Sequence, residues 1–209
     1  MTKISFSGFS GSGKTSLLAE VKKILSLKSK VDSIDEIKGK NPFDSDQKSS
    51  FISNFFLMST QINEENIKSM TGSDYLLCDQ SVLDEWVNWN CYISDKEVNP
   101  QLEQKHNLLK DLYRLWIQTY DLIFLIRIDL NEFEKREFNN EIRIADIEHI
   151  KKMDALYKTT IDADNLKVIE IWNNTTIDES AHKIIQSISD FKETEEEKEE
   201  EEEEKDQEV

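Results

Sequence analysis

The chain has 209 residues, of which 26 are basic and 43 acidic, and its formal net charge is −17. This length suits one domain with a buried core, while the acidic balance disfavours tight, nonspecific binding to nucleic acid. The longest unbroken apolar run, residues 122–126, is far shorter than the roughly 20 residues of a membrane-spanning helix. The first residues lack a basic start followed by an apolar stretch, so no secretory leader is visible and we expect a cytoplasmic protein.

Short apolar segments alternate with amphipathic helical patterns along the chain. Strands are predicted at residues 3–7, 31–34, 75–79, 122–128 and 168–171. Helices are predicted directly after residue 13, at 46–70, at 82–93, from 100 to about 120, after 146, and at 177–191. Parallel strands joined by helices predict a three-layer α/β/α sandwich around a five-stranded, mainly parallel sheet.

The acidic charge is concentrated at one end of the sequence. Residues 192–209 hold 12 acidic and 3 basic residues, against 31 and 23 in residues 1–191. Such a segment has too little apolar surface to pack. We therefore expect a folded domain over 1–191 and a disordered, solubilising acidic tail over 192–209.

Glycine is scarce, with five in all, yet three of them fall within six residues. The segment from Gly8 to Thr15 matches G-x-x-x-x-G-K-[ST], between a predicted strand and a predicted helix. In this motif the glycines let backbone N–H groups point at phosphate oxygens, and the helix N-terminus adds positive potential. The predicted nucleotide-binding residues are Gly8, Ser10, Gly11, Ser12, Gly13, Lys14, Thr15 and Ser16.

Lys14 and Thr15 imply the cofactors ATP and Mg²⁺. In such a loop the lysine reaches the β- and γ-phosphates, and the hydroxyl of the last residue holds Mg²⁺. Asp79 ends an apolar strand at the edge of the sheet where ligands bind, so we expect it to contact the metal through water. The alternative is that Asp79 caps the next helix, a task that Ser81 could also perform.

These motifs resemble the P-loop kinases, and above all the AAA-type ATPase/kinase domains related to ribosylnicotinamide kinase and the nucleoside and nucleotide kinases. The likeness covers residues 1–191 and implies a nucleotide kinase-like P-loop NTPase fold. Residues 35–38 (DEIK) resemble the family's E-x-x-R with Lys38 at the arginine place, and Gln61 with Glu65 resembles its Q-x-x-x-E. Residues 79–84 (DQSVLD) resemble D-R-S-x-x-D, and Arg143 sits where the family has a lid arginine.

The resemblance implies a phosphotransferase whose catalytic residues are Lys14, Glu36, Asp79 and Arg143. Glu36 follows a strand and would orient the acceptor hydroxyl or take its proton, although it could also be an ordinary surface acid. Arg143 would close over the transferring group and stabilise its negative charge. We predict transfer of the γ-phosphate of ATP to a nucleoside, nucleotide or related small metabolite.

One departure from the family bears on the acceptor. The sequence has no arginine between residues 36 and 113, and Gln80 stands at the arginine place of D-R-S. Arginine grips a phosphate through two parallel hydrogen bonds, which lysine cannot make. The acceptor is then a neutral nucleoside, or the chain is a nucleotide-binding regulatory ATPase module without an acceptor. Nearby lysines keep a nucleotide acceptor open, and the sequence leaves the oligomeric state undecided, a homodimer included.

Overall fold

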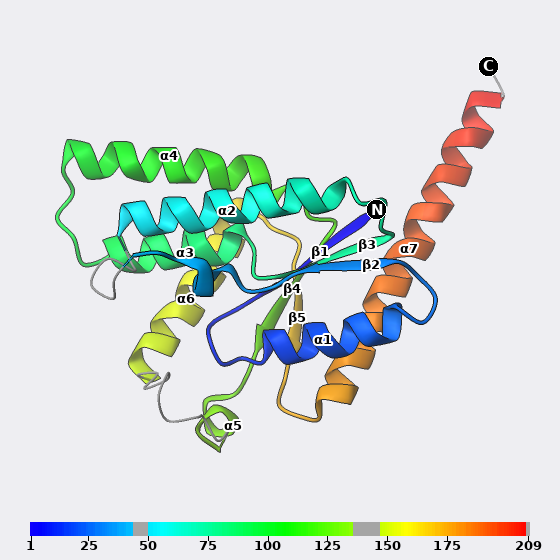
Figure 1. Cartoon of the computed structure of the whole chain (residues 1–209), viewed down its shortest axis with the longest axis horizontal. Coiled ribbons are helices and arrows are strands. Elements are labelled where there is room, and N and C mark those ends of the chain that lie inside the picture. Colours follow the sequence, from blue (N-terminus) through cyan, green and yellow to red (C-terminus); the bar gives the residue numbers. More distant parts are fainter. Residues whose placement is uncertain (44–49, 136–146, 208–209) are drawn as a thin grey trace.

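The computed structural model describes residues 1–43, 50–135 and 147–207 (Figure 1). Its five strands form one sheet in the order β2-β3-β1-β4-β5, and every neighbouring pair is parallel. The strands are β1 (Thr2–Ser7), β2 (Val31–Ile34), β3 (Tyr75–Asp79), β4 (Leu122–Arg127) and β5 (Ile169–Trp172). The predicted five-stranded parallel sheet is confirmed.

The helices follow the predicted order, with two short additions. They are α1 (Lys14–Leu25), α2 (Phe51–Ser69), α3 (Val82–Ile93), α4 (Pro100–Ile117), α5 (Leu130–Lys135), α6 (Ile147–Asp164) and α7 (Ile177–Gln207), with the 3-10 helix η1 (Ile37–Lys40). The side chains of Ser50 and Asn99 cap α2 and α4 by accepting backbone N–H bonds. The sequence pattern missed α5 and η1 because neither is long enough to display a helical period.

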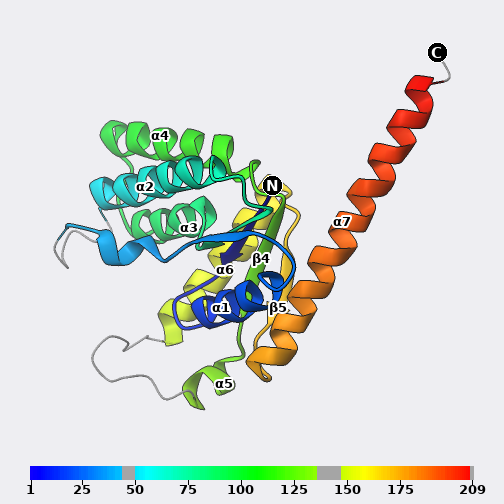
Figure 2. The same ribbon diagram turned by 45° about the vertical axis from the view of Figure 1, so that its right-hand side comes forward.

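Alternation along the strands sends apolar side chains to both faces of the sheet. Leu77 and Phe124 join the cluster beneath α1 and α7, whereas Leu76 and Ile123 join the cluster beneath α2, α3, α4 and α6. Figures 1 and 2 show these two helix layers on opposite sides of the strands. A sheet buried on both faces explains why the strands read as continuous apolar runs, and it confirms the three-layer fold.

The acidic end of the chain differs from the expectation of disorder after Lys192. The structure continues α7 to Gln207 as a helix that projects away from the body of the domain (Figure 2). Residues 193–198 are exposed, and Lys198 forms an ion pair with Glu195 one turn earlier, at 2.6 Å. Glutamate and lysine are good helix formers, and no glycine or proline interrupts them. No helix in the described ranges is long and apolar enough to cross a membrane.

Candidate functional site

The loop from Gly8 to Gly13 has a backbone that only glycine adopts readily. Gly8, Gly11 and Gly13 have φ of 139°, 94° and 96°. A Cβ atom at Gly8 would lie 2.4 Å from the carbonyl oxygen of Ile126 in β4. The loop therefore packs directly against the neighbouring strand and forms a cradle between β1 and the N-terminus of α1.

Lys14 folds back over this cradle. Its buried Nζ donates hydrogen bonds to the carbonyl oxygens of Gly8, at 2.6 Å, and Phe9, at 3.1 Å. Burial lowers the pKa of the Lys14 ammonium, and the opposing charge of Asp84 works against that shift. The one cation of the loop is thus held inside it, and its contact with nucleotide phosphates stays a prediction.

Thr15 and Asp79 meet at the C-terminal end of β3. The Thr15 hydroxyl donates to Asp79 Oδ2 at 2.6 Å, while Asp79 Oδ1 is buried with no hydrogen-bond partner among the described residues. Burial raises the pKa of the Asp79 carboxyl, and the bond from Thr15 opposes the rise. Asp79 does not cap α3, because Ser81 Oγ accepts the Leu83 N–H at 3.1 Å.

Asp84 links the loop to two helices, a role that was not predicted from the sequence. Its Oδ1 accepts the Gly8 N–H at 2.9 Å and the Tyr157 hydroxyl of α6 at 2.7 Å. Its Oδ2 accepts the N–H of Ser81 at 2.8 Å and completes a capping box at the start of α3. An acidic residue three positions after a serine N-cap is the sequence signal for that box. The contact with Gly8 had no such signal, because it spans 76 residues.

Glu36 lies half-buried at the N-terminus of η1 and faces β3. Its Oε1 accepts a hydrogen bond from Gln80 Nε2 at 3.0 Å, whereas the neighbouring Asp35 is exposed. Gln80 has a φ of 96°, a strained value for a residue other than glycine, and its carbonyl accepts a 3.4 Å bond from Gln61 Nε2. The residue at the family's arginine place therefore holds the candidate base.

Glu65, the second residue of the Q-x-x-x-E pattern, joins elements of the fold through hydrogen bonds. It is buried and accepts hydrogen bonds from Lys3 Nζ at 3.0 Å, Trp116 Nε1 at 2.6 Å and the Tyr120 hydroxyl at 2.5 Å. These contacts tie α2 to β1 and to the end of α4. Glu65 does not line the pocket described next.

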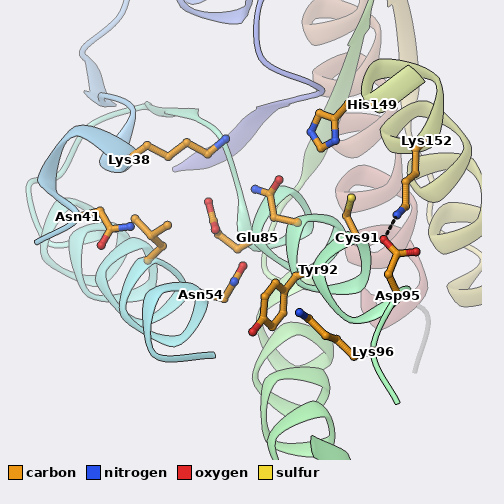
Figure 3. Close-up of a pocket in the computed structure, with 12 residues that line it drawn as sticks. Lys38, Asn41, Asn54, Glu85, Cys91, Tyr92, Asp95, Lys96, His149 and Lys152 are labelled. Atoms are coloured by element: carbon orange, nitrogen blue, oxygen red, sulfur yellow. Dashed lines mark hydrogen bonds and ion pairs between the residues drawn. The ribbon is translucent and has the colours of Figure 1, made fainter. Parts of the chain in front are cut away.

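A pocket of about 570 Å³ opens beside the cradle, between η1, α2, α3 and α6 (Figure 3). Lys38, Asn88 and His149 line it and also line a cavity of about 130 Å³ whose remaining walls include Gly8, Phe9 and Ser10. The pocket therefore adjoins a cavity at the glycine-rich loop. The described lining contains lysines and a histidine as its basic groups, and no arginine.

Glu85 is the most deeply buried acidic residue of this pocket, with 4% of its surface exposed. Burial raises the pKa of its carboxyl to about 7, against the attraction of Lys38 and a hydrogen bond from Asn88. Glu85 was not predicted from the sequence, because an acidic residue is common in the first turn of a helix and carries no signal of its burial there. Of the predicted catalytic residues, the structure gathers Lys14, Glu36 and Asp79 at one edge, and Arg143 lies outside the described residues.

Comparison with known proteins finds one matching family model and solved structures with a similar fold. The model of the AAA domain family matches residues 3–179. A deoxyadenosine kinase from M. mycoides superposes with a TM-score of 0.67 at 15% identity, covering 90% of this chain and 100% of that one. A thymidylate kinase from Candida albicans superposes with a TM-score of 0.62 at 16% identity, covering 91% and 92%.

At these identities the two likenesses show that this chain shares the fold of these kinases. No curated protein matches the chain. The family model covers most of the chain, from β1 into α7. The chain belongs to the AAA domain family.

Proposed function

We propose that this protein is an ATP- and Mg²⁺-dependent phosphotransferase that moves the γ-phosphate of ATP to a nucleoside, nucleotide or related small metabolite. The observation that carries the proposal is the adjacency of two spaces. A small cavity at the glycine-rich loop shares walls, among them Lys38, with a pocket of about 570 Å³. A phosphotransferase needs such a pair of adjoining sites, one for the donor phosphates and one for the acceptor.

The residues present fit ATP and Mg²⁺. The left-handed glycines shape a cradle in which N–H groups of Gly11, Ser12 and Gly13 would hold phosphate oxygens, flanked by Ser10 and Ser16. The Thr15 hydroxyl and the unpartnered Oδ1 of Asp79 are the hard oxygen donors that Mg²⁺ prefers. When bound, the metal ion neutralises charge that develops on the β- and γ-phosphate oxygens. Lys14 would supply further positive charge to these phosphates.

On the acceptor side, Glu36 would orient the attacking hydroxyl and receive its proton. The bond from Gln80 at 3.0 Å holds one of its oxygens and leaves the other to accept a hydrogen bond. Arg143 would stabilise the charge of the transferring group, a role proposed from sequence alone. The free thiols of Cys78 and Cys91 support a reducing, cytoplasmic setting.

A transfer screen tests the proposal. Labelled γ-phosphate would be followed from ATP to nucleosides, nucleoside monophosphates and ribosylnicotinamide. We expect transfer to at least one acceptor, lost in Lys14→Ala and kept in Lys28→Ala, an exposed lysine of the loop after α1. Transfer to no acceptor, with ATP binding intact, would contradict the proposal. It would favour the alternative of a nucleotide-binding regulatory ATPase module, which the absence of arginine from the described pocket lining also suits.

A further inference from the structure

Glu85 stands apart from the other acidic group of the pocket. Asp95 at the rim forms an ion pair with Lys152 at 2.8 Å, whereas no salt bridge among the described residues includes Glu85. Its Oε2 is buried and has no hydrogen-bond partner in the described parts of the chain. A buried oxygen left without a donor is costly, so such an atom in a pocket wall indicates a bound group that supplies one.

The neighbouring amides do not supply that donor, and the hydrogen bond from Asn88 to Glu85 leaves Oε2 without a partner among the described residues. Asn41 Nδ2 donates to Ser53 Oγ at 2.8 Å, and Asn54 Nδ2 donates to the carbonyl oxygen of Ser50 at 2.9 Å. Figure 3 shows Glu85 between Lys38 and Asn54 inside the pocket. The donor for Oε2 is therefore expected from the ligand, at a point separated from the cradle by the shared wall of Lys38.

We propose that Glu85 reads the base of the acceptor and selects nucleosides whose base carries an exocyclic amino group, as in cytosine or adenine. This inference rests on the proposed phosphotransfer to a nucleoside. An ionised carboxylate only accepts hydrogen bonds, so an amino group satisfies it. A carbonyl oxygen at the same place, as in uracil or hypoxanthine, would set two acceptors against each other and leave both unsatisfied.

The protonation state of Glu85 modulates this selection. Because burial raises the pKa of its carboxyl to about 7, the group is largely ionised at pH 8 and largely protonated at pH 6. The protonated acid also donates, so it tolerates a carbonyl. Among the described residues, the charged or titratable groups around it are Glu36 and Lys38 at η1, Asp84, Cys91 and Tyr92 on α3, Asp95 and Lys96 after α3, and His149, Lys152 and Tyr157 on α6. Selection for the amino group should therefore strengthen as pH rises.

Calorimetric binding of matched nucleosides tests the inference without requiring turnover. Cytidine would be compared with uridine, and adenosine with inosine, on the wild-type chain and on Glu85→Gln, whose amide both donates and accepts. In at least one pair the wild type should bind the amino nucleoside at least about tenfold more tightly near pH 8, and by a smaller ratio near pH 6. Glu85→Gln should lose most of that preference, while Glu97→Gln, at an exposed position outside the pocket lining, should retain it.

Equal affinities within both pairs near pH 8 would overturn the inference, as would no binding of any nucleoside or a preference that survives in Glu85→Gln. Thermal melts would establish that the variant is folded, and if it is not, the pH dependence of the wild-type ratio decides alone. Phosphate transfer measured on the same samples separates the two proposals. Selective binding without transfer would refute the proposed function and leave the role of Glu85 standing.

Discussion

The hydroxyl of Thr15 lies 2.6 Å from Oδ2 of Asp79, a contact between residues 64 positions apart. One residue belongs to the first turn of α1 and the other ends β3. The pair sets two oxygen donors side by side, and the second oxygen of Asp79 has no hydrogen-bond partner among the described residues. This arrangement gives the first prediction.

Asp79→Asn should weaken the binding of ATP in the presence of Mg²⁺ at least about tenfold, or ~1.4 kcal/mol, because an amide is a poorer metal ligand than a carboxylate. The amide oxygen can still accept the Thr15 hydroxyl, so the fold should persist. Titration of ATP with and without Mg²⁺ measures the effect. Asp111→Asn, at an exposed position on α4, is the matched control. Identical Mg²⁺ dependence in both variants would exclude Asp79 from the metal site.

Gly8→Ala should destabilise the domain by about 2 kcal/mol or more, since its φ of 139° and the Ile126 carbonyl oxygen both exclude a Cβ atom. Gly39→Ala is the matched comparison, because a Cβ atom there meets nothing within 4 Å. Thermal melting should show a clear decrease in Tm for the first variant and little change for the second. Equal Tm values would mean that the loop is not packed against β4 as described.

Glu85 should make stability depend on pH with a definite sign. Its carboxyl has a pKa of about 7 in the folded chain, against an ordinary value of 4.5. The folded state therefore binds more protons between these values, and the stability attributable to Glu85 falls as pH rises from 4.5 to 7. Relative to the wild type, Glu85→Gln should gain up to about 3 kcal/mol across this range and no more above it. Chemical denaturation of both proteins at a series of pH values measures the difference. If the difference in the free energy of unfolding between the two proteins does not vary with pH, Glu85 is not buried as described.

The acceptor should be neutral. The described pocket lining offers lysines, as at Lys38, but not the two-pronged grip of arginine. We expect kcat/KM for a nucleoside to exceed that for its monophosphate by about tenfold, as for cytidine against its monophosphate. If the monophosphate is instead preferred and the preference disappears in Lys38→Ala, then Lys38 is a phosphate ligand and the acceptor is a nucleotide.

Truncation after Lys192 should leave Tm and activity unchanged, because residues 193–198 are exposed and α7 has left the domain by this point (Figure 2). Helical circular dichroism should decrease, since the structure continues the helix to Gln207. Loss of Tm or turnover would show that the acidic end docks on the domain. Unchanged dichroism would mean that this end is not helical in solution.

Much of the fold was predictable because its signals are local. A phosphate cradle is predicted from about a dozen neighbouring residues, namely the strand that ends at Ser7, the glycines after it and Lys14. The apolar runs predict strands that are buried on both faces. The same holds for Asp79, whose place at a strand end implies the ligand-binding edge. The helical form of the acidic end is also a local property, but composition alone favoured disorder there.

The sequence by itself determined the sheet, the helix order and the nucleotide-binding loop, since each follows from short-range periodicity or from one contiguous motif. Only the tertiary structure decided that Asp84 holds the N–H of Gly8, that Gln80 holds Glu36, and that Glu85 faces a pocket with an unpartnered oxygen. The two hydrogen bonds join residues dozens of positions apart. The sequence also does not distinguish a buried acidic side chain from a solvated one. Burial and partnership are set by packing between α3, η1 and the loop after β1, which no local pattern encodes.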